Sequence, residues 1–263
     1  MPSLFLIVVI DLIGFGIIIP LLPFYAEFYD ASPTEVGLIM ATYSFTQFLA
    51  APFWGKLSDK IGRKPVLTFS LAGLSLSYVL LGLSQSLIFL FFARAIGGFM
   101  AGNISAAFAY VADITTKKNR AKGMGLIGAA FGVGFTLGPA IGGLLAGSDP
   151  VNADFKTPAF ASAIFSGFAL IITALFLKES LTLEVRKEQS KGKKNSTYKS
   201  LIAILSERAL AIPLILVFLS TFAFAGLEAT FAMWSKRQFG WGPEQNGYLF
   251  AFIGIFGALI QGT

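Results

Sequence analysis

Eight runs of about 20 largely apolar residues follow one another along the chain, and they restrict the possible folds more than any other feature. An α-helix rises about 1.5 Å per residue, so about 20 apolar residues are needed to cross the hydrocarbon core of a bilayer. Only 13% of the residues are charged, whereas soluble domains carry about 25%. The sequence therefore predicts an all-α membrane protein whose spans cover approximately residues 3–26, 36–54, 66–84, 86–112, 121–147, 158–178, 209–234 and 246–263.

The distribution of basic residues predicts how these spans are oriented. Of the 20 Lys and Arg residues, 16 lie in the connections that follow the second, fourth and sixth runs, three lie in the other connections, and Arg94 lies within a run. Cytoplasmic connections of membrane proteins are enriched in Lys and Arg. We therefore expect a multi-pass protein of the inner cell membrane with its N-terminus in the cytoplasm. Because topology accounts for the net charge of +6, no nucleic-acid partner is expected.

The residue inventory excludes several kinds of chemistry. The chain has no Cys and no His, so disulfides, imidazole metal sites and nucleophiles activated by a histidine base are ruled out. The ionisable residues deep within the apolar runs are Asp11, Arg94 and Glu228, which do not provide the cluster of acids that a membrane-embedded enzyme would need. We expect no enzymatic activity, no cofactor and no metal ion.

One long polar stretch divides the chain into two unequal parts. Residues 1–178 hold six spans, residues 179–208 form a basic linker expected in the cytoplasm, and residues 209–263 hold two spans. A gapless offset of 210 residues aligns 32–37 with 242–247, which places the eighth span on the second. This arrangement is typical of a transporter built from two parallel repeats, and we therefore expect the chain to be a fragment that lacks about four helices.

The connection after the second span combines glycines with opposite charges. Gly55 and Gly62 suit a tight turn between antiparallel helices, and Asp59 is followed four residues later by Arg63, which allows an ion pair across the turn. The spacing alone favours this ion pair no more than a solvated cytoplasmic loop in which Asp59 is incidental.

Four motifs together resemble those of the major facilitator superfamily, in the order and on the helices where that family carries them. The likeness is greatest to drug/proton antiporters of the tetracycline-efflux type. The connection after the second span resembles motif A, the first span motif D, the fourth span motif B and the fifth span motif C. The matching residues are Gly55, Leu57, Asp59, Gly62, Arg63 and Lys64 for motif A; Asp11, Gly14, Gly16, Pro20 and Pro23 for motif D; Arg94, Ala95, Ile96, Gly97, Gly98 and Gly102 for motif B; and Gly134, Gly138, Pro139, Gly142 and Gly143 for motif C.

This resemblance implies both a fold and a function. The fold would be a complete N-terminal six-helix bundle followed by the first two helices of a C-terminal bundle. The function would be secondary active transport, with drugs or other small amphipathic molecules exported in exchange for protons by alternating access, by a monomer in the lipid bilayer. A proton-coupled symporter that takes up a sugar or small organic solute is the alternative, because a fold does not fix the substrate. A scaffold or sensor with this fold but without transport activity is a further alternative. No substrate-binding residue is assigned.

Asp11 and Arg94 are the proposed proton-coupling residues. Asp11 lies about eight residues into its span, roughly 12 Å deep, where a charge is costly unless it is paired or hydrated. Arg94 enters the membrane from the opposite side to a depth within about 6 Å of Asp11, so its long side chain is expected to reach the carboxylate. Because Arg stays ionised in proteins, only the carboxylate can carry a transported proton. A permanent salt bridge that merely orders the bundle is the alternative.

A second group of charges is expected at the cytoplasmic face. Asp113 ends the fourth span on the same face as the loop that carries Asp59 and Arg63, so it can reach Arg63. The resemblance implies that these charges, with Gly55 and Gly62, latch that face in one conformation. A solvated surface pair of little energetic value is the alternative.

The glycines of the fifth span predict close helix packing. Gly134, Gly138 and Gly142 recur every four residues and form a groove without side chains, Gly143 lies beside it, and Pro139 favours a kink. A nucleotide-binding loop is rejected because no Lys-Ser/Thr follows and the segment lies at membrane depth. Glu228 is expected to extend towards the membrane surface.

Overall fold

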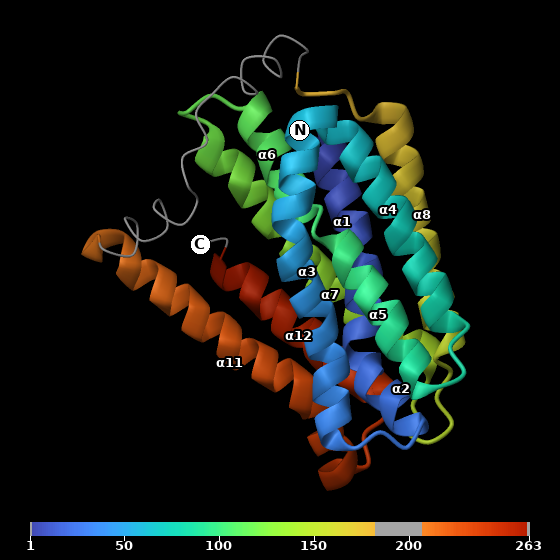
Figure 1. Cartoon of the computed structure of the whole chain (residues 1–263). Coiled ribbons are helices and arrows are strands. Elements are labelled where there is room, and N and C mark those ends of the chain that lie inside the picture. The colour runs from blue at the N-terminus through green and yellow to red at the C-terminus, as the bar shows by residue number, and fades with distance from the viewer. Residues whose placement is uncertain (1, 182–206, 262–263) are drawn as a thin grey trace.

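The computed structural model describes residues 2–181 and 207–261, and every regular element within these ranges is a helix (Figure 1). The elements are α1 (Pro2–Ile18), η1 (Ile19–Leu21), α2 (Leu22–Phe28), α3 (Pro33–Ile61), α4 (Arg63–Gly82), α5 (Leu87–Ala101), α6 (Ile104–Ile114), α7 (Arg120–Ala146), α8 (Lys156–Phe176), α11 (Arg208–Phe239) and α12 (Pro243–Gln261). The predicted all-α membrane fold is confirmed.

Seven helical segments of the described ranges are long and apolar enough to cross a membrane. In two of them the chain forms a single span from more than one helix, since α1, η1 and α2 together cover Pro2–Phe28 and α5 and α6 cover Leu87–Ile114. The eighth predicted span corresponds to α12, which is not among the seven; its first turn carries the polar residues Glu244, Gln245 and Asn246.

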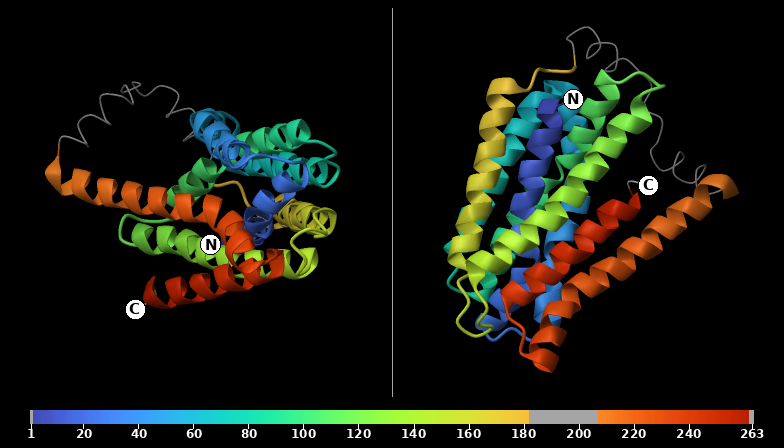
Figure 2. Two further views of the ribbon diagram at one scale, coloured as in Figure 1. Left: turned by 90° about the horizontal axis from the view of Figure 1, so that it is seen from below. Right: turned by 180° about the vertical axis from the view of Figure 1, so that it is seen from behind.

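Helix α1 lies at the centre of the first six spans (Figures 1 and 2). It packs against α7 on one side and α8 on another, while α3 packs on α5 and α4 on both α5 and α8. Apolar side chains cover all faces of α1, and Leu4, Ile7, Ile13 and Ile17 are buried. A helix that is apolar on all sides is stable only where it is surrounded, which explains its central position.

The two helices after the linker contact the first part of the chain differently. Helix α12 packs along α7. Helix α11 contacts α2 and α3 near its C-terminal end, where Ala232, Met233 and Ser235 are buried, whereas residues 212–227 are exposed. Figures 1 and 2 show α11 diverging from the six-span bundle towards the end where the N-terminus lies.

Two of the predicted continuous spans are interrupted. Pro20 lies in the 3-10 turn between α1 and α2, and Pro23 lies in the first turn of α2. Each proline lacks a backbone N–H, which favours a break in the helix. The fourth span breaks at Gly102 and Asn103, and side chains satisfy groups near the break: the indole of Trp54 donates to the carbonyl of Phe99 (2.6 Å). Interruptions of this kind are tolerated at membrane depth when neighbouring side chains bond the freed backbone.

The connection between α3 and α4 differs from its prediction. We expected a loop over 55–65, but α3 continues to Ile61 and α4 begins at Arg63, so Gly62 alone makes the turn. Gly62 has φ 111°, a conformation that side chains rarely adopt. Gly55 lies within α3, where a Cβ atom would be 3.7 Å from the hydroxyl of Ser105 on α6.

The aligned repeat segments begin helices at corresponding positions. Pro33 is the first residue of α3 and Pro243 is the first residue of α12. Proline suits this position because its missing N–H would have no partner within the helix. The start of α3 is further stabilised by Ser32 and Glu35, each of which caps the backbone N–H of the other.

Candidate functional site

Asp11 is held by α8 rather than by Arg94. The carboxylate of Asp11, partly buried on α1, accepts a hydrogen bond of 2.9 Å from the hydroxyl of Ser166. Within the described part of the chain no ion pair joins Asp11 to Arg94. The predicted contact between Asp11 and Arg94 is therefore wrong for this conformation. The Arg94 guanidinium lies against an aromatic ring instead.

Arg94 is a buried cation without an adjacent counter-ion. Only 5% of the residue is exposed, and its guanidinium carbon lies 4.1 Å from the centroid of the Tyr43 ring on α3, a cation–π contact. Among buried side-chain N and O atoms of the described residues, its Nε alone lacks a hydrogen-bond partner. Its charge interacts electrostatically with Glu228 on α11.

Aromatic side chains form a continuous series beside these charges. The ring of Phe15 stacks on Tyr43 at 5.2 Å and meets Phe135 of α7 edge-on at 6.1 Å. Phe135 in turn contacts Phe131 at 6.3 Å and, edge-on at the same distance, Phe224 of α11. We call Phe15, Tyr43, Phe131, Phe135 and Phe224 the aromatic cluster.

The cluster joins the two parts of the chain, since four of its rings belong to the first six spans and Phe224 to α11. It also changes the interpretation of Glu228. We expected this acid to extend to the membrane surface, but it is half-buried, lies one turn beyond Phe224, and interacts with Arg94.

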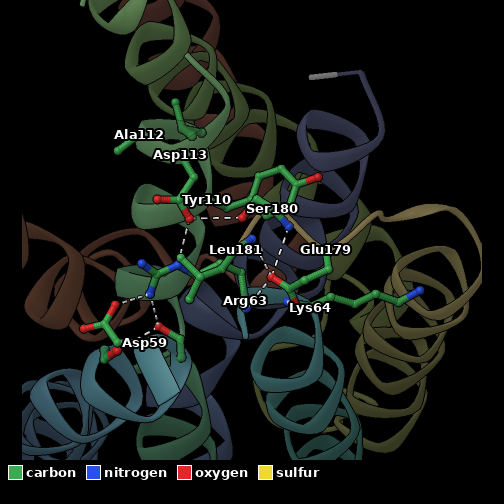
Figure 3. A network of polar contacts seen from close by, with 12 residues as sticks. Asp59, Arg63, Lys64, Tyr110, Ala112, Asp113, Glu179, Ser180 and Leu181 are labelled. Atoms are coloured by element: carbon green, nitrogen blue, oxygen red, sulfur yellow. Dashed lines mark hydrogen bonds and ion pairs between the residues drawn. The ribbon is translucent and has the colours of Figure 1, made fainter. Parts of the chain in front are cut away.

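Arg63 occupies the centre of a polar network at the end of the bundle near the N-terminus (Figure 3). Its guanidinium contacts Asp59 at 2.6 Å and Asp113 at 3.0 Å, and it donates to the hydroxyl of Ser58 at 2.6 Å. The side chain of Arg63 is only 5% exposed, so this is a buried cation between two acids rather than a solvated surface pair. The role of these contacts as a latch stays a prediction.

The chain that follows α8 completes this network, which the sequence did not reveal. Glu179 accepts hydrogen bonds from the backbone N–H groups of Arg63 (2.9 Å) and Lys64 (3.1 Å), the first two residues of α4. A carboxylate is favoured at this position because the backbone N–H groups of the first turn have no partners within the helix. The hydroxyl of Ser180 donates to Asp113 at 3.0 Å (Figure 3).

The glycine groove of α7 is filled by backbone. A Cβ atom on Gly138 would lie 2.6 Å from the Cα of Gly16, and one on Gly134 would lie 2.9 Å from the carbonyl carbon of Leu12, both on α1. Gly143 faces the other way, where a Cβ atom would lie 2.8 Å from the carbonyl oxygen of Pro243 at the start of α12. The glycines therefore allow α7 to approach two helices at once.

Replacing Gly138 by alanine is expected to destabilise the protein by about 1–3 kcal/mol, because the new methyl group collides with the backbone of α1. Gly132 on the same helix is the matched control: nothing lies within 4 Å of its Cβ position, so alanine should be neutral or stabilise by up to about 1 kcal/mol. Thermal unfolding of the two detergent-purified variants measures the difference. Equal melting temperatures would contradict close packing at Gly138.

Ion pairs also join the two parts of the chain at the end opposite the Arg63 network. Glu27 of α2 contacts Lys236 at 2.7 Å and Arg237 at 3.5 Å. Both basic residues were expected in a connection, but α11 continues to Phe239, so they lie in its last turn. Cations are favoured there by the helix dipole.

A family model described as Major Facilitator Superfamily matches residues 4–263. The chain belongs to this superfamily. The four motifs that resemble those of this family begin on α1, α3, α5 and α7.

The relatives include proteins named for drug resistance. Multidrug resistance protein 2 of Bacillus subtilis (strain 168) is 32% identical over 250 residues, which cover 95% of this chain and 61% of that protein. The class H tetracycline resistance protein of Pasteurella multocida is 31% identical over 261 residues, covering 97% and 63%. The chain thus spans about three fifths of the length of these curated relatives.

A solved structure supports the fold over the whole chain. The crystal structure of the human organic anion transporter MFSD10 (TETRAN) matches with a TM-score of 0.77 and 28% sequence identity, covering 100% of this chain and 70% of that one.

Proposed function

We propose that this major facilitator protein exports drugs or other small amphipathic molecules in exchange for protons. The observation that carries the proposal is its identity of 31–32% to multidrug and tetracycline resistance proteins over nearly the whole chain. A partly buried acid, Asp11, supports proton coupling, because a carboxylate within a membrane bundle can bind and release a proton whereas Arg94 stays charged.

The proposed mechanism is alternating access by two bundles. Residues 1–178 form the N-terminal bundle, 179–208 the linker, and 209–263 the first two helices of the C-terminal bundle. In this proposal the contacts between Glu27 and the end of α11 close one side of the protein, and the divergence of α11 leaves the other side open. The inner cell membrane, a cytoplasmic N-terminus and a monomeric state belong to the same proposal.

The Arg63 network is proposed to control which side is open. It fixes α3, α4, α6 and the segment after α8 relative to one another at the end expected in the cytoplasm. Rearrangement of a buried ion pair is costly, so such a network favours one discrete conformation over intermediates. The glycine groove of α7 is proposed to let α1 and α12 shift along α7 without side-chain collisions.

Transport in everted membrane vesicles tests the direction and the coupling. Vesicles from cells that express the complete gene should accumulate a fluorescent drug when their interior is acid, and a protonophore should release it. Vesicles from cells without the gene are the control. Accumulation in right-side-out vesicles under an inward proton gradient would contradict export and favour a symporter.

A further inference from the structure

Asp11 and Arg94 lie within the bundle without pairing with each other. Asp11 on α1 accepts a hydrogen bond from Ser166, Arg94 on α5 lies against the ring of Tyr43, and no ion pair of the described residues includes either charge. Arg94 is 5% exposed, and its Nε has no hydrogen-bond partner. An unpaired cation within a membrane bundle is costly, so the contact that holds Arg94 in this position needs a function.

Tyr43 of α3 lies beside both charges. The guanidinium carbon of Arg94 is 4.1 Å from the centroid of its ring, and the ring of Phe15 stacks on it at 5.2 Å. Phe15 follows Asp11 by one helical turn, so the two side chains share a face of α1. The phenol of Tyr43 also interacts electrostatically with both Arg94 and Asp11. A single ring therefore contacts the cation and the helix face that carries the acid.

The two glycines that follow Arg94 on α5 allow this arrangement. A Cβ atom on Gly98 would collide with the backbone carbonyl oxygen of Tyr43, and one on Gly97 would lie 3.4 Å from Cε2 of the Tyr43 ring. Because these positions carry no side chains, α3 can approach α5 closely enough to place the ring over the guanidinium. Tyr43 is only 5% exposed, so close packing keeps its ring in this position.

Few other titratable groups lie near the two charges. Helix α4 supplies Tyr78, which interacts electrostatically with both of them, and α11 supplies Glu228, which interacts with Arg94. Helices α7 and α8 have no titratable side chain beyond their first turns. If the Tyr43 ring were absent, Asp11 would be the acid on the helix against which that ring stacks, and Arg94 is expected to pair with it.

We propose that Tyr43 is a positioning residue for proton coupling. Its ring holds the Arg94 guanidinium and thereby leaves the Asp11 carboxylate free to bind and release a proton. This inference rests on the proposed export function and on Asp11 as the proton carrier. A carboxylate paired permanently with Arg94 would stay ionised, because a neighbouring cation stabilises the charged form. The protein would then still exchange substrate across the membrane, but it could not couple that movement to protons.

Transport of radiolabelled ethidium by the complete protein in proteoliposomes separates this role from a purely structural one. Tyr43→Leu should reduce accumulation driven by an acid interior about tenfold, whereas exchange of labelled for unlabelled ethidium without a proton gradient should change less than about twofold. Tyr43→Phe keeps the ring and should retain both activities. Exchange of Tyr43 for a trifluorinated phenylalanine weakens the attraction between ring and cation at nearly constant shape, and it should reduce accumulation even if Tyr43→Leu does not fold.

Tyr25→Leu is the matched control. Tyr25 has the same exposure of 5% and stacks on Phe155 at 4.7 Å, but it lies on α2, at the end of the bundle opposite the Arg63 network. Its loss should leave the ratio of proton-driven accumulation to exchange unchanged. The same unchanged ratio in both Tyr43→Leu and the fluorinated variant would overturn the proposal, as would an equal loss of accumulation in Tyr43→Phe.

Thermal unfolding of the purified complete protein tests the rearrangement independently of transport. If Arg94 pairs with Asp11 once the ring is removed, Asp11→Asn should lower the melting temperature of Tyr43→Leu by several degrees more than that of wild type, because it breaks a buried ion pair. Equal effects in the two backgrounds would contradict the proposed role of Tyr43. Failure of the export function is distinguishable, because the wild type would then show no proton-driven accumulation while the difference between the backgrounds persists.

Discussion

Exchange of Asp11 for asparagine in the complete transporter is expected to abolish gradient-driven export. Asparagine has nearly the same size and its side-chain oxygen can still accept the hydrogen bond from Ser166, but it cannot bind and release a proton. The packing of α1 against α8 should therefore survive while coupling is lost. Accumulation of a fluorescent drug in everted vesicles with an acid interior, at matched membrane expression, measures the effect.

Ser166→Ala provides the comparison for Asp11→Asn. It removes the hydrogen bond of 2.9 Å but leaves the carboxylate in place, so proton-driven export should persist at a reduced level. If Asp11→Asn exports at the wild-type rate under the same gradient, Asp11 has a structural role and the coupling acid lies elsewhere. Equal loss in the two variants would assign the effect to the hydrogen bond rather than to proton transfer.

Replacement of Arg63 by alanine is expected to cost about 3–5 kcal/mol, because it leaves the acids of a buried ion-pair network without their cation. In the proposed mechanism the same change releases the end of the bundle that carries the network, so a cysteine introduced into the open side should react with a thiol reagent at an altered rate. Thermal unfolding measures the first effect and reagent labelling the second. Arg63→Lys should restore only part of the stability and only part of the wild-type labelling rate. An ammonium group lacks the planar fork of donors that a guanidinium provides.

The two acids of this network should contribute unequally. The side chain of Asp113 is 18% exposed and that of Asp59 is 52% exposed, although both contact Arg63. Asp59→Asn should therefore cost no more than about 1 kcal/mol, because half of the Asp59 side chain stays in solvent. Asp113→Asn should cost more, because it also weakens the contact with Ser180. Equal melting temperatures for these variants would contradict a buried contact at Asp113.

Features that depend on helical periodicity and span order were predictable from the sequence. Alternate spans run in opposite directions, so the end of the fourth span had to lie on the same face as the second connection, and Asp113 does contact Arg63. The glycines spaced by four on α7 likewise had to share a face, and they do pack on α1.

Features that depend on the exact path of irregular segments were not predictable. Glu179 reaches the start of α4 only because the chain turns back after α8, and no local pattern marks it for that contact. The rotation of α1 brings Asp11 to Ser166 instead of Arg94, and a serine in an apolar run gives no signal of such a partner. Glu228 was misjudged because its environment is set by how α11 lies against the other helices, which periodicity within α11 does not define.

Gly62 alone connects α3 to α4. Because a single residue joins α3 to α4, the two helices form a rigid pair, and a displacement of one helix moves the other. An inserted residue would rotate α4 by about 100° about its axis and disengage Arg63 from both acids. The connection 147–155 between α7 and α8 is longer, but its ends are held: the backbone N–H of Glu244 donates to the carbonyl of Gly147 at 3.2 Å, and Phe155 is buried. Its exposed residues Val151 and Asn152 are therefore the place to introduce a tag or fluorophore.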